Sequence, residues 1–128
     1  MGWDAFAVRV RGKKELGRSY ARSYLTDPKL RPLFIAAEAE VKRLASTCDG
    51  FLRYAALDCS ACAYEFERCT GQTAWAKNGY TPEQVKQMAD ESLWTTESCD
   101  PDNLWAFYSV KMFIQTCAKA GLGVRFSW

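Results

Sequence analysis

Residues 51–69, FLRYAALDCSACAYEFERC, decide how the chain folds. Read as one helix at about 100° per residue, the stretch places its apolar side chains on roughly one third of the circumference. Polar residues such as Arg53, Tyr64 and Arg68 fall on the other faces, and Gly71 follows at the position typical of a C-terminal cap. The pattern predicts a helix over 51–69 with a buried stripe of Phe51, Leu52, Ala55, Cys59, Cys62, Phe66 and Cys69.

The two ends of the chain carry alternating patterns that are typical of half-buried strands. In AFAVRVR, residues 5–11, the expected inward residues are Phe6, Val8 and Val10. In GVRFSW, residues 123–128, they are Val124, Phe126 and Trp128. Because two isolated strands are unstable alone, we expect them to pair with each other and to cover the helices.

Helical signals fill most of the remaining sequence. The stretch 13–25 has a tyrosine stripe, 27–31 reads as a turn, and a helix is expected over 32–47. Thr81 to Gln84 form a capping box that starts a helix to about Trp94, and Asp100-Pro101 begins a long helix to about Ala120. The sequence predicts a mainly α (α+β) fold, with four to five helices around a central C-terminal helix and a terminal two-stranded ribbon. We expect one globular domain over 1–128.

Composition indicates an ordinary globular protein in a reducing compartment. The 128 residues are 48% hydrophobic and 25% charged, with a formal net charge of +2. The N-terminal residues lack the pattern of a secretory signal, and no apolar run approaches membrane length. The sequence therefore predicts a cytoplasmic protein whose six cysteines are mostly reduced.

The cysteines allow three interpretations. Cys48, Cys59, Cys62 and Cys69 could supply four thiolates to zinc, although structural zinc sites usually draw ligand pairs from two short loops. Cys59 and Cys62 form a C-x-x-C pair, which is redox-active when it follows a strand at a helix N-terminus, with FLRYAAL as that strand. The helical spacing favours the third interpretation, in which the thiols are small apolar groups in the core. We expect no metal and no cofactor.

Catalytic signals are sparse. The chain has no histidine, which is the commonest acid–base residue and the usual partner of a serine or cysteine nucleophile. Neither common type of glycine-rich phosphate loop is present. No matched set of nucleophile, base and stabilising group emerges, so the sequence predicts a protein without enzymatic activity.

Basic residues concentrate near the N-terminus. Residues 1–32 hold eight basic and three acidic side chains, an imbalance that suits an anionic partner such as nucleic acid or an acidic protein surface. A solvated face without a partner is the competing interpretation. The predicted basic face consists of Arg9, Arg11, Lys13, Lys14, Arg18, Arg22 and Arg125. Loop aromatics form a second candidate interface, consisting of Trp75, Tyr80 and Trp94.

The opening MGWDAFA and the closing GLGVRFSW resemble the ends of small accessory proteins encoded by bacteriophages and prophages. The resemblance implies a protein that binds a host defence or regulatory complex, in the manner of inhibitors of CRISPR effectors. On this basis we expect a phage-type inhibitor that docks on a host protein or ribonucleoprotein complex. Direct nucleic-acid binding through the basic face is one alternative, and a small zinc or thiol-redox protein using Cys59 and Cys62 is another.

Overall fold

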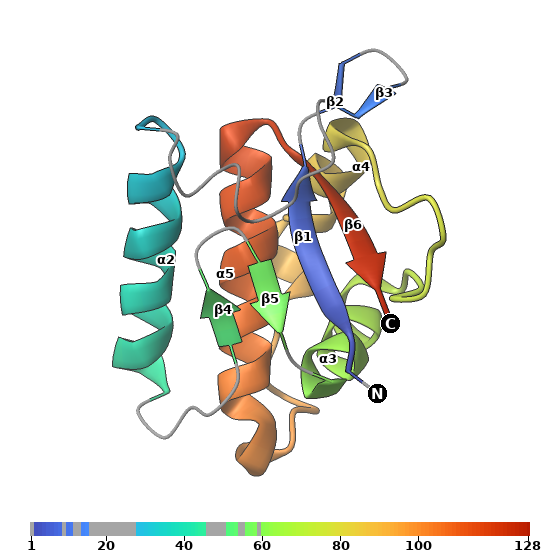
Figure 1. Ribbon diagram of the computed structural model, residues 1–128. Helices are drawn as coiled ribbons and strands as arrows, with labels where there is room; N and C mark the ends of the chain where they lie inside the picture. Colours follow the sequence, from blue (N-terminus) through green and yellow to red (C-terminus); the bar gives the residue numbers. More distant parts are fainter. Residues whose placement is uncertain are drawn as a thin grey trace.

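The computed structural model describes residues 2–8, 10–11, 14–15, 28–45, 51–53, 56–58 and 60–128 (Figure 1). In chain order the strands are β1 (Asp4–Val8), β2 (Val10–Arg11), β3 (Lys14–Glu15), β4 (Phe51–Arg53), β5 (Ala56–Asp58) and β6 (Gly123–Ser127). The helices are α2 (Arg31–Leu44), α3 (Ser60–Thr70), α4 (Pro82–Met88) and α5 (Leu104–Ala120), with short 3-10 turns η1 (Glu91–Leu93) and η2 (Pro101–Asn103). The fold is mainly helical α+β, as the sequence predicts.

The expected pairing of the chain ends is present within a larger sheet. Strands β1 and β6 run antiparallel, and Ala5 lies opposite Phe126. The sheet has the order β4-β5-β1-β6, and its neighbouring strands are all antiparallel. A separate two-stranded ribbon joins β2 to β3. The predicted terminal ribbon is therefore the β1–β6 half of a four-stranded sheet.

The prediction of one helix over 51–69 is wrong in its first half. Residues 51–53 and 56–58 form the antiparallel strands β4 and β5, and the helix α3 begins only at Ser60. Leu57 lies opposite Ala5 of β1 and is fully buried. The edge of β1 supplies hydrogen bonds to β5, and the sequence of residues 51–58 alone gives no sign of this pairing. Such tertiary pairing commonly overrides local periodicity. The second half of the prediction is confirmed, because Cys62, Phe66 and Cys69 are buried on α3.

The predicted orientation of β1 is wrong for Phe6, whereas Val8 is buried as expected and the side chain of Val10 lies outside the described residues. Ala5 and Ala7 face the core, together with their opposite residues Phe126 and Val124. Because directly opposed residues share one face of a sheet, Phe6 lies on the other face beside Arg125. The two alanines leave room for the large aromatic side chains that fill the core, including Trp3, Phe66 and Phe126. The predicted inward orientation of Val124 and Phe126 is confirmed, whereas Trp128 is exposed.

The other helices begin close to where the sequence places them. Helix α2 follows a turn at 28–30, has proline in its first turn, and buries Phe34, Ala37 and Val41. Thr81 caps α4 in the predicted capping box, but α4 ends at Met88 rather than Trp94. Lys14 and Glu15 form a strand, and the rest of the helix expected over 13–25 lies outside the described residues.

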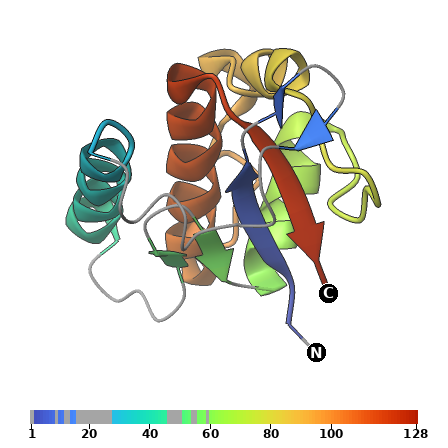
Figure 2. The same ribbon diagram turned by 45° about the horizontal axis from the view of Figure 1, so that its top comes forward.

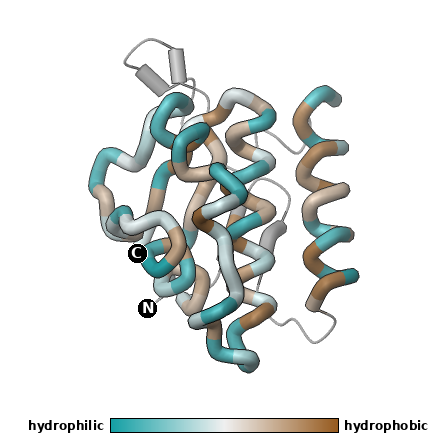
Figure 3. The backbone as a smooth tube through the Cα atoms, turned by 180° about the vertical axis from the view of Figure 1, so that it is seen from behind, coloured by the Kyte–Doolittle hydropathy of each residue, from teal (hydrophilic) through white to brown (hydrophobic). Residues whose placement is uncertain are grey.

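Helix α5 is the centre of the fold, as predicted. It contacts α2, α3 and α4 and also packs against β4, β5 and β6. Figures 1 and 2 show the described helices gathered on one face of the four-stranded sheet. Seen from behind in Figure 3, hydrophobic stretches alternate with hydrophilic ones along α2, which matches its buried Phe34, Ala37 and Val41. Gly121 ends α5 in the left-handed conformation at φ 71°, which favours glycine.

Candidate interaction surface

Two tryptophans from distant parts of the chain meet on the surface. The Trp75 and Trp128 rings lie edge to face, with centroids 5.6 Å apart and an interplanar angle of 87°. The pair remains exposed, since 47% of Trp75 and 52% of Trp128 is accessible to solvent. Trp75 belongs to the loop 71–80 between α3 and α4, and Trp128 follows β6. Large aromatic side chains presented together at a surface are typical anchors of protein interfaces.

The loop 71–80 is tied to the fold at several points. The Trp3 indole N–H donates to the Ala74 carbonyl at 2.7 Å, and the Ala74 N–H donates to the Glu67 carboxylate at 3.1 Å. At the far end of the loop, Tyr80 and Val124 exchange two backbone hydrogen bonds of 2.8 and 3.0 Å. These contacts fix the backbone on both sides of Trp75. Its side chain is therefore presented by an ordered loop against the end of β6.

Tyr80 and Trp94, the other predicted loop aromatics, serve the fold. The Tyr80 ring packs against Phe66 and Phe126, and its hydroxyl donates to the Thr73 carbonyl at 2.7 Å. Burial raises the pKa of Tyr80, and the nearby Glu67 carboxylate acts in the same direction. Trp94 is buried and donates its indole N–H to the Met88 carbonyl at 2.8 Å. Of the three predicted aromatics, Trp75 is the one that belongs to the exposed pair.

Most of the predicted basic face falls outside the part of the chain that the structure describes. Residues 9, 13, 18 and 22 lie there, and Arg11 and Lys14 are described by their strand backbone alone. Arg125 is half-buried on the outer face of the sheet beside Phe6. We expected the odd-numbered residues of the first strand to share this face with Arg125, but Ala5 and Ala7 point to the core. The grouping of Arg9 and Arg11 with Arg125 stays a prediction, because the side chains of residues 9 and 11 lie outside the described part of the chain.

Cys62, the described member of the C-x-x-C pair, lies in the first turn of α3, shortly after strand β5. β5 ends at Asp58 and α3 begins at Ser60, which is the backbone context that the redox interpretation requires. Cys62 is fully buried beside the core residues of α3, and positions 48 and 59 lie outside the described residues. Burial raises the pKa of Cys69. Among the described side chains, no group of three or more cysteine or carboxylate residues is placed to hold a metal ion.

Sequence reasoning missed a buried polar cluster around Glu65. The Glu65 side chain is fully buried, and its carboxylate accepts from Arg68 Nε at 2.6 Å and from the Cys99 thiol at 3.1 Å. Arg68 also donates to the Thr95 carbonyl at 2.9 Å. Burial and the bond to Glu65 raise the pKa of Cys99 to about 11, so the thiol stays protonated at neutral pH. The cluster fastens the segment 95–100 to α3, and spacing alone carries no signal for the contact with Cys99.

Comparisons of the chain with protein-family models, with curated proteins and with solved structures find no match. Within the described part of the chain, none of the helices combines the length and the apolar character needed to cross a bilayer.

Proposed function

We propose that the protein is a non-enzymatic binding protein that docks on a protein partner through the exposed Trp75–Trp128 pair. The observation that carries the proposal is the edge-to-face contact of these rings at a solvent-exposed site. Tryptophan is enriched among residues that dominate binding energy, because it buries a large area at low conformational cost. The resemblance of the chain ends to phage accessory proteins supports a host protein or ribonucleoprotein complex as the partner, met in a bacterial cytoplasm.

A protein partner fits the surroundings of the pair better than nucleic acid does. Surfaces that bind single strands combine stacking rings with a groove of basic side chains along the phosphate backbone. The loop 71–80 carries one charged residue, Lys77. An apolar or aromatic patch on a protein, rimmed by polar groups, matches such a surface more closely.

The proposal is tested by affinity capture from a bacterial lysate. The bait proteins are the unchanged chain, the double variant Trp75→Ala plus Trp128→Ala, and Tyr64→Ala as a control. Tyr64 is the matched residue because 62% of it is exposed on a different element, α3. A partner retained by the unchanged chain and by Tyr64→Ala, but reduced roughly tenfold or more by the double variant, supports the proposal. Equal capture by all three baits contradicts it, and capture that disappears after nuclease treatment favours nucleic acid.

A thiol-redox protein is the second candidate, favoured by the strand-to-helix junction at residues 58–60. In this alternative Cys59 and Cys62 would cycle between dithiol and disulfide. Titration in glutathione buffers of defined potential, followed by mass spectrometry after alkylation, tests it. A reversible loss of two thiols that is absent in Cys62→Ser supports the redox function, and six thiols throughout the titration contradict it.

A further inference from the structure

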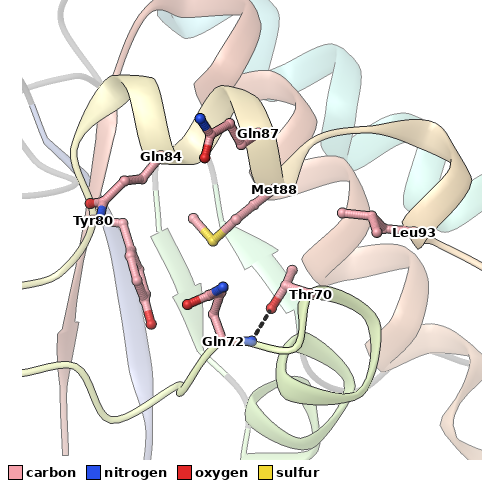
Figure 4. A pocket seen from close by; sticks show the side chains of 7 residues that line it. All are labelled: Thr70, Gln72, Tyr80, Gln84, Gln87, Met88 and Leu93. Carbon is pink, nitrogen blue, oxygen red and sulfur yellow. Dashed lines mark hydrogen bonds between the residues drawn. The ribbon is translucent and has the colours of Figure 1, made fainter.

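A pocket opens between the end of α3, the loop 71–80, α4 and η1. Its volume is about 250 Å³. The lining residues are Thr70, Gln72, Tyr80, Gln84, Gln87, Met88 and Leu93 (Figure 4). None of them carries a charge at neutral pH, so the pocket offers no counterion to a phosphate, a carboxylate or an ammonium group.

Three of the chain's four glutamines line this pocket, and the fourth, Gln115, instead donates to Glu91 at 2.6 Å. Gln84 accepts the Thr81 N–H through its carbonyl oxygen at 2.9 Å, and its NH₂ group bonds to none of the residues that the structure describes. Among the described residues, no hydrogen bond engages the side-chain amides of Gln72 or Gln87. Each such amide offers two donors and one acceptor oxygen side by side.

Apolar and aromatic groups form most of the remaining wall, together with Thr70, whose hydroxyl donates to the Phe66 carbonyl and accepts from the Gln72 N–H. Met88 is almost completely buried, and its thioether lies between Tyr80 and Leu93 in Figure 4. The Tyr80 ring is held in place by Phe66, Phe126 and its bond to Thr73. Sulfur and aromatic rings contact the faces of flat ligands favourably, whereas amides contact their edges.

We propose that this pocket binds a neutral, planar heterocycle of the nucleobase class, with adenine as the best-matched base. The volume lies just below the roughly 300 Å³ at which pockets for drug-sized ligands begin, which suits a single ring system. Glutamine recognises adenine through paired hydrogen bonds to N6 and N7. An amide side chain of a partner protein could form similar hydrogen bonds, but it would lose rotamer freedom on binding. A rigid base has no rotamers to lose, which favours it as the ligand. This site is separate from the Trp75–Trp128 pair and does not depend on the proposed function.

NMR titration of the ¹⁵N-labelled protein with adenine tests the proposal directly. The side-chain NH₂ signals of Gln72, Gln84 and Gln87 should shift and saturate, with a dissociation constant on the order of 0.1–1 mM. The NH₂ signal of Gln115 is the internal control and should not move. Benzimidazole, which has a similar shape but fewer hydrogen-bonding groups, should bind roughly tenfold more weakly.

Variants and further probes separate the competing outcomes. Gln87→Leu should weaken adenine binding roughly tenfold, and Lys86→Ala, on the same helix but outside the pocket, should leave it unchanged. Absence of shifts up to the solubility limit of adenine overturns the proposal. Binding of adenosine monophosphate without binding of adenine also overturns it, because recognition would then require a cation. Equal binding of adenine and benzimidazole shows that the amides do not select the ligand and overturns it as well.

Discussion

The thiol of Cys99 donates to the buried carboxylate of Glu65 at 3.1 Å, across 34 residues of sequence. The other carboxylate oxygen accepts from Arg68, whose side chain is 14% exposed. Both oxygens of Glu65 are thus satisfied in the interior, which is the condition under which a buried charge is tolerated. The cluster connects α3 to the segment that leads into α5.

Replacing Glu65 with alanine should destabilise the protein strongly. The change leaves the Arg68 guanidinium without its partner in a largely buried place, which should lower the free energy of unfolding by about 3 kcal/mol. Chemical denaturation monitored by circular dichroism measures the effect. Glu40→Ala is the control, because Glu40 pairs with Arg43 on the exposed side of α2 and its loss should change stability little. Equal effects of the two changes would show that Glu65 is not buried with Arg68.

Stability should fall at alkaline pH. The pKa of Cys99 rises from 9.0 to about 11 on folding, so the unfolded thiol loses its proton first. The stabilisation is therefore fully present below pH 9 and is lost as the pH rises toward 11. The raised pKa values of Cys69, Cys117 and Tyr80 act with the same sign. Denaturation curves between pH 7 and 11 should show that the free energy of unfolding falls less steeply with pH in Cys99→Ala than in the unchanged protein. An equal slope in both would mean that Cys99 does not cause the decline.

Gly79→Ala should disturb the loop that presents Trp75. A Cβ at residue 79 would lie 2.1 Å from the Val124 carbonyl oxygen, and φ is +65°. Gly71 has nearly the same φ, +70°, but a Cβ there meets no atom of the described residues within 4 Å. Gly71→Ala therefore measures the backbone strain alone, about 1–2 kcal/mol, without a steric clash. Gly79→Ala should be clearly less stable than Gly71→Ala in thermal melts, and equal losses would mean that the Tyr80–Val124 pairing tolerates the methyl group.

Phe66→Ala should cost about 3–5 kcal/mol, as other large core truncations do. Phe66 is fully buried and packs against Phe126 and Tyr80. Tyr64→Ala, two residues earlier on α3 and mostly exposed, provides the control in the same helix. Urea denaturation compares the two variants, and a near-neutral result for Phe66→Ala would mean that this face of α3 does not pack on the sheet.

Ser109→Ala should leave stability unchanged or increase it by about 1 kcal/mol. Ser109 is fully buried in α5, and its hydroxyl has no described hydrogen-bond partner. Removing an unsatisfied hydroxyl eliminates a desolvation cost without opening a large cavity. Val110→Ala, at the next buried position of the same helix, should instead destabilise through lost packing. A marked loss of stability in Ser109→Ala would reveal a bonded water or another partner.

The elements that the sequence predicts correctly carry their own local signals. Thr81 and Gln84 mark the start of α4, and Gly121 marks the end of α5, because caps depend on neighbouring residues alone. The alternation in β6 also suffices to orient Val124 and Phe126. Strands β4 and β5 are different, since they exist where β1 offers an unpaired edge. The inward face of β1 is the one whose small residues, Ala5 and Ala7, leave room for the aromatic core. Hydrophobicity alone favours Phe6 instead.

In the candidate sites, too, single residues stand out in the sequence, whereas the contacts between them depend on the fold. Trp75 stands out in the sequence as a loop aromatic, but its contact with Trp128 depends on the pairing of β6 beside the loop 71–80. The glutamine pocket joins α3, α4 and η1, and no local pattern relates Gln72 to Gln87. Cys99 gains a role only through Glu65, whose burial follows from the packing of α3 against α5.

The position of β1 between β5 and β6 orders events during synthesis on the ribosome. β5 leaves the ribosome soon enough to pair with β1, whereas β6 follows only after the helices α3, α4 and α5 have been made. Until then, one side of β1 presents open backbone groups to other nascent chains. Slow arrival of β6 therefore makes this half-built sheet the point at which misassembly is expected to begin.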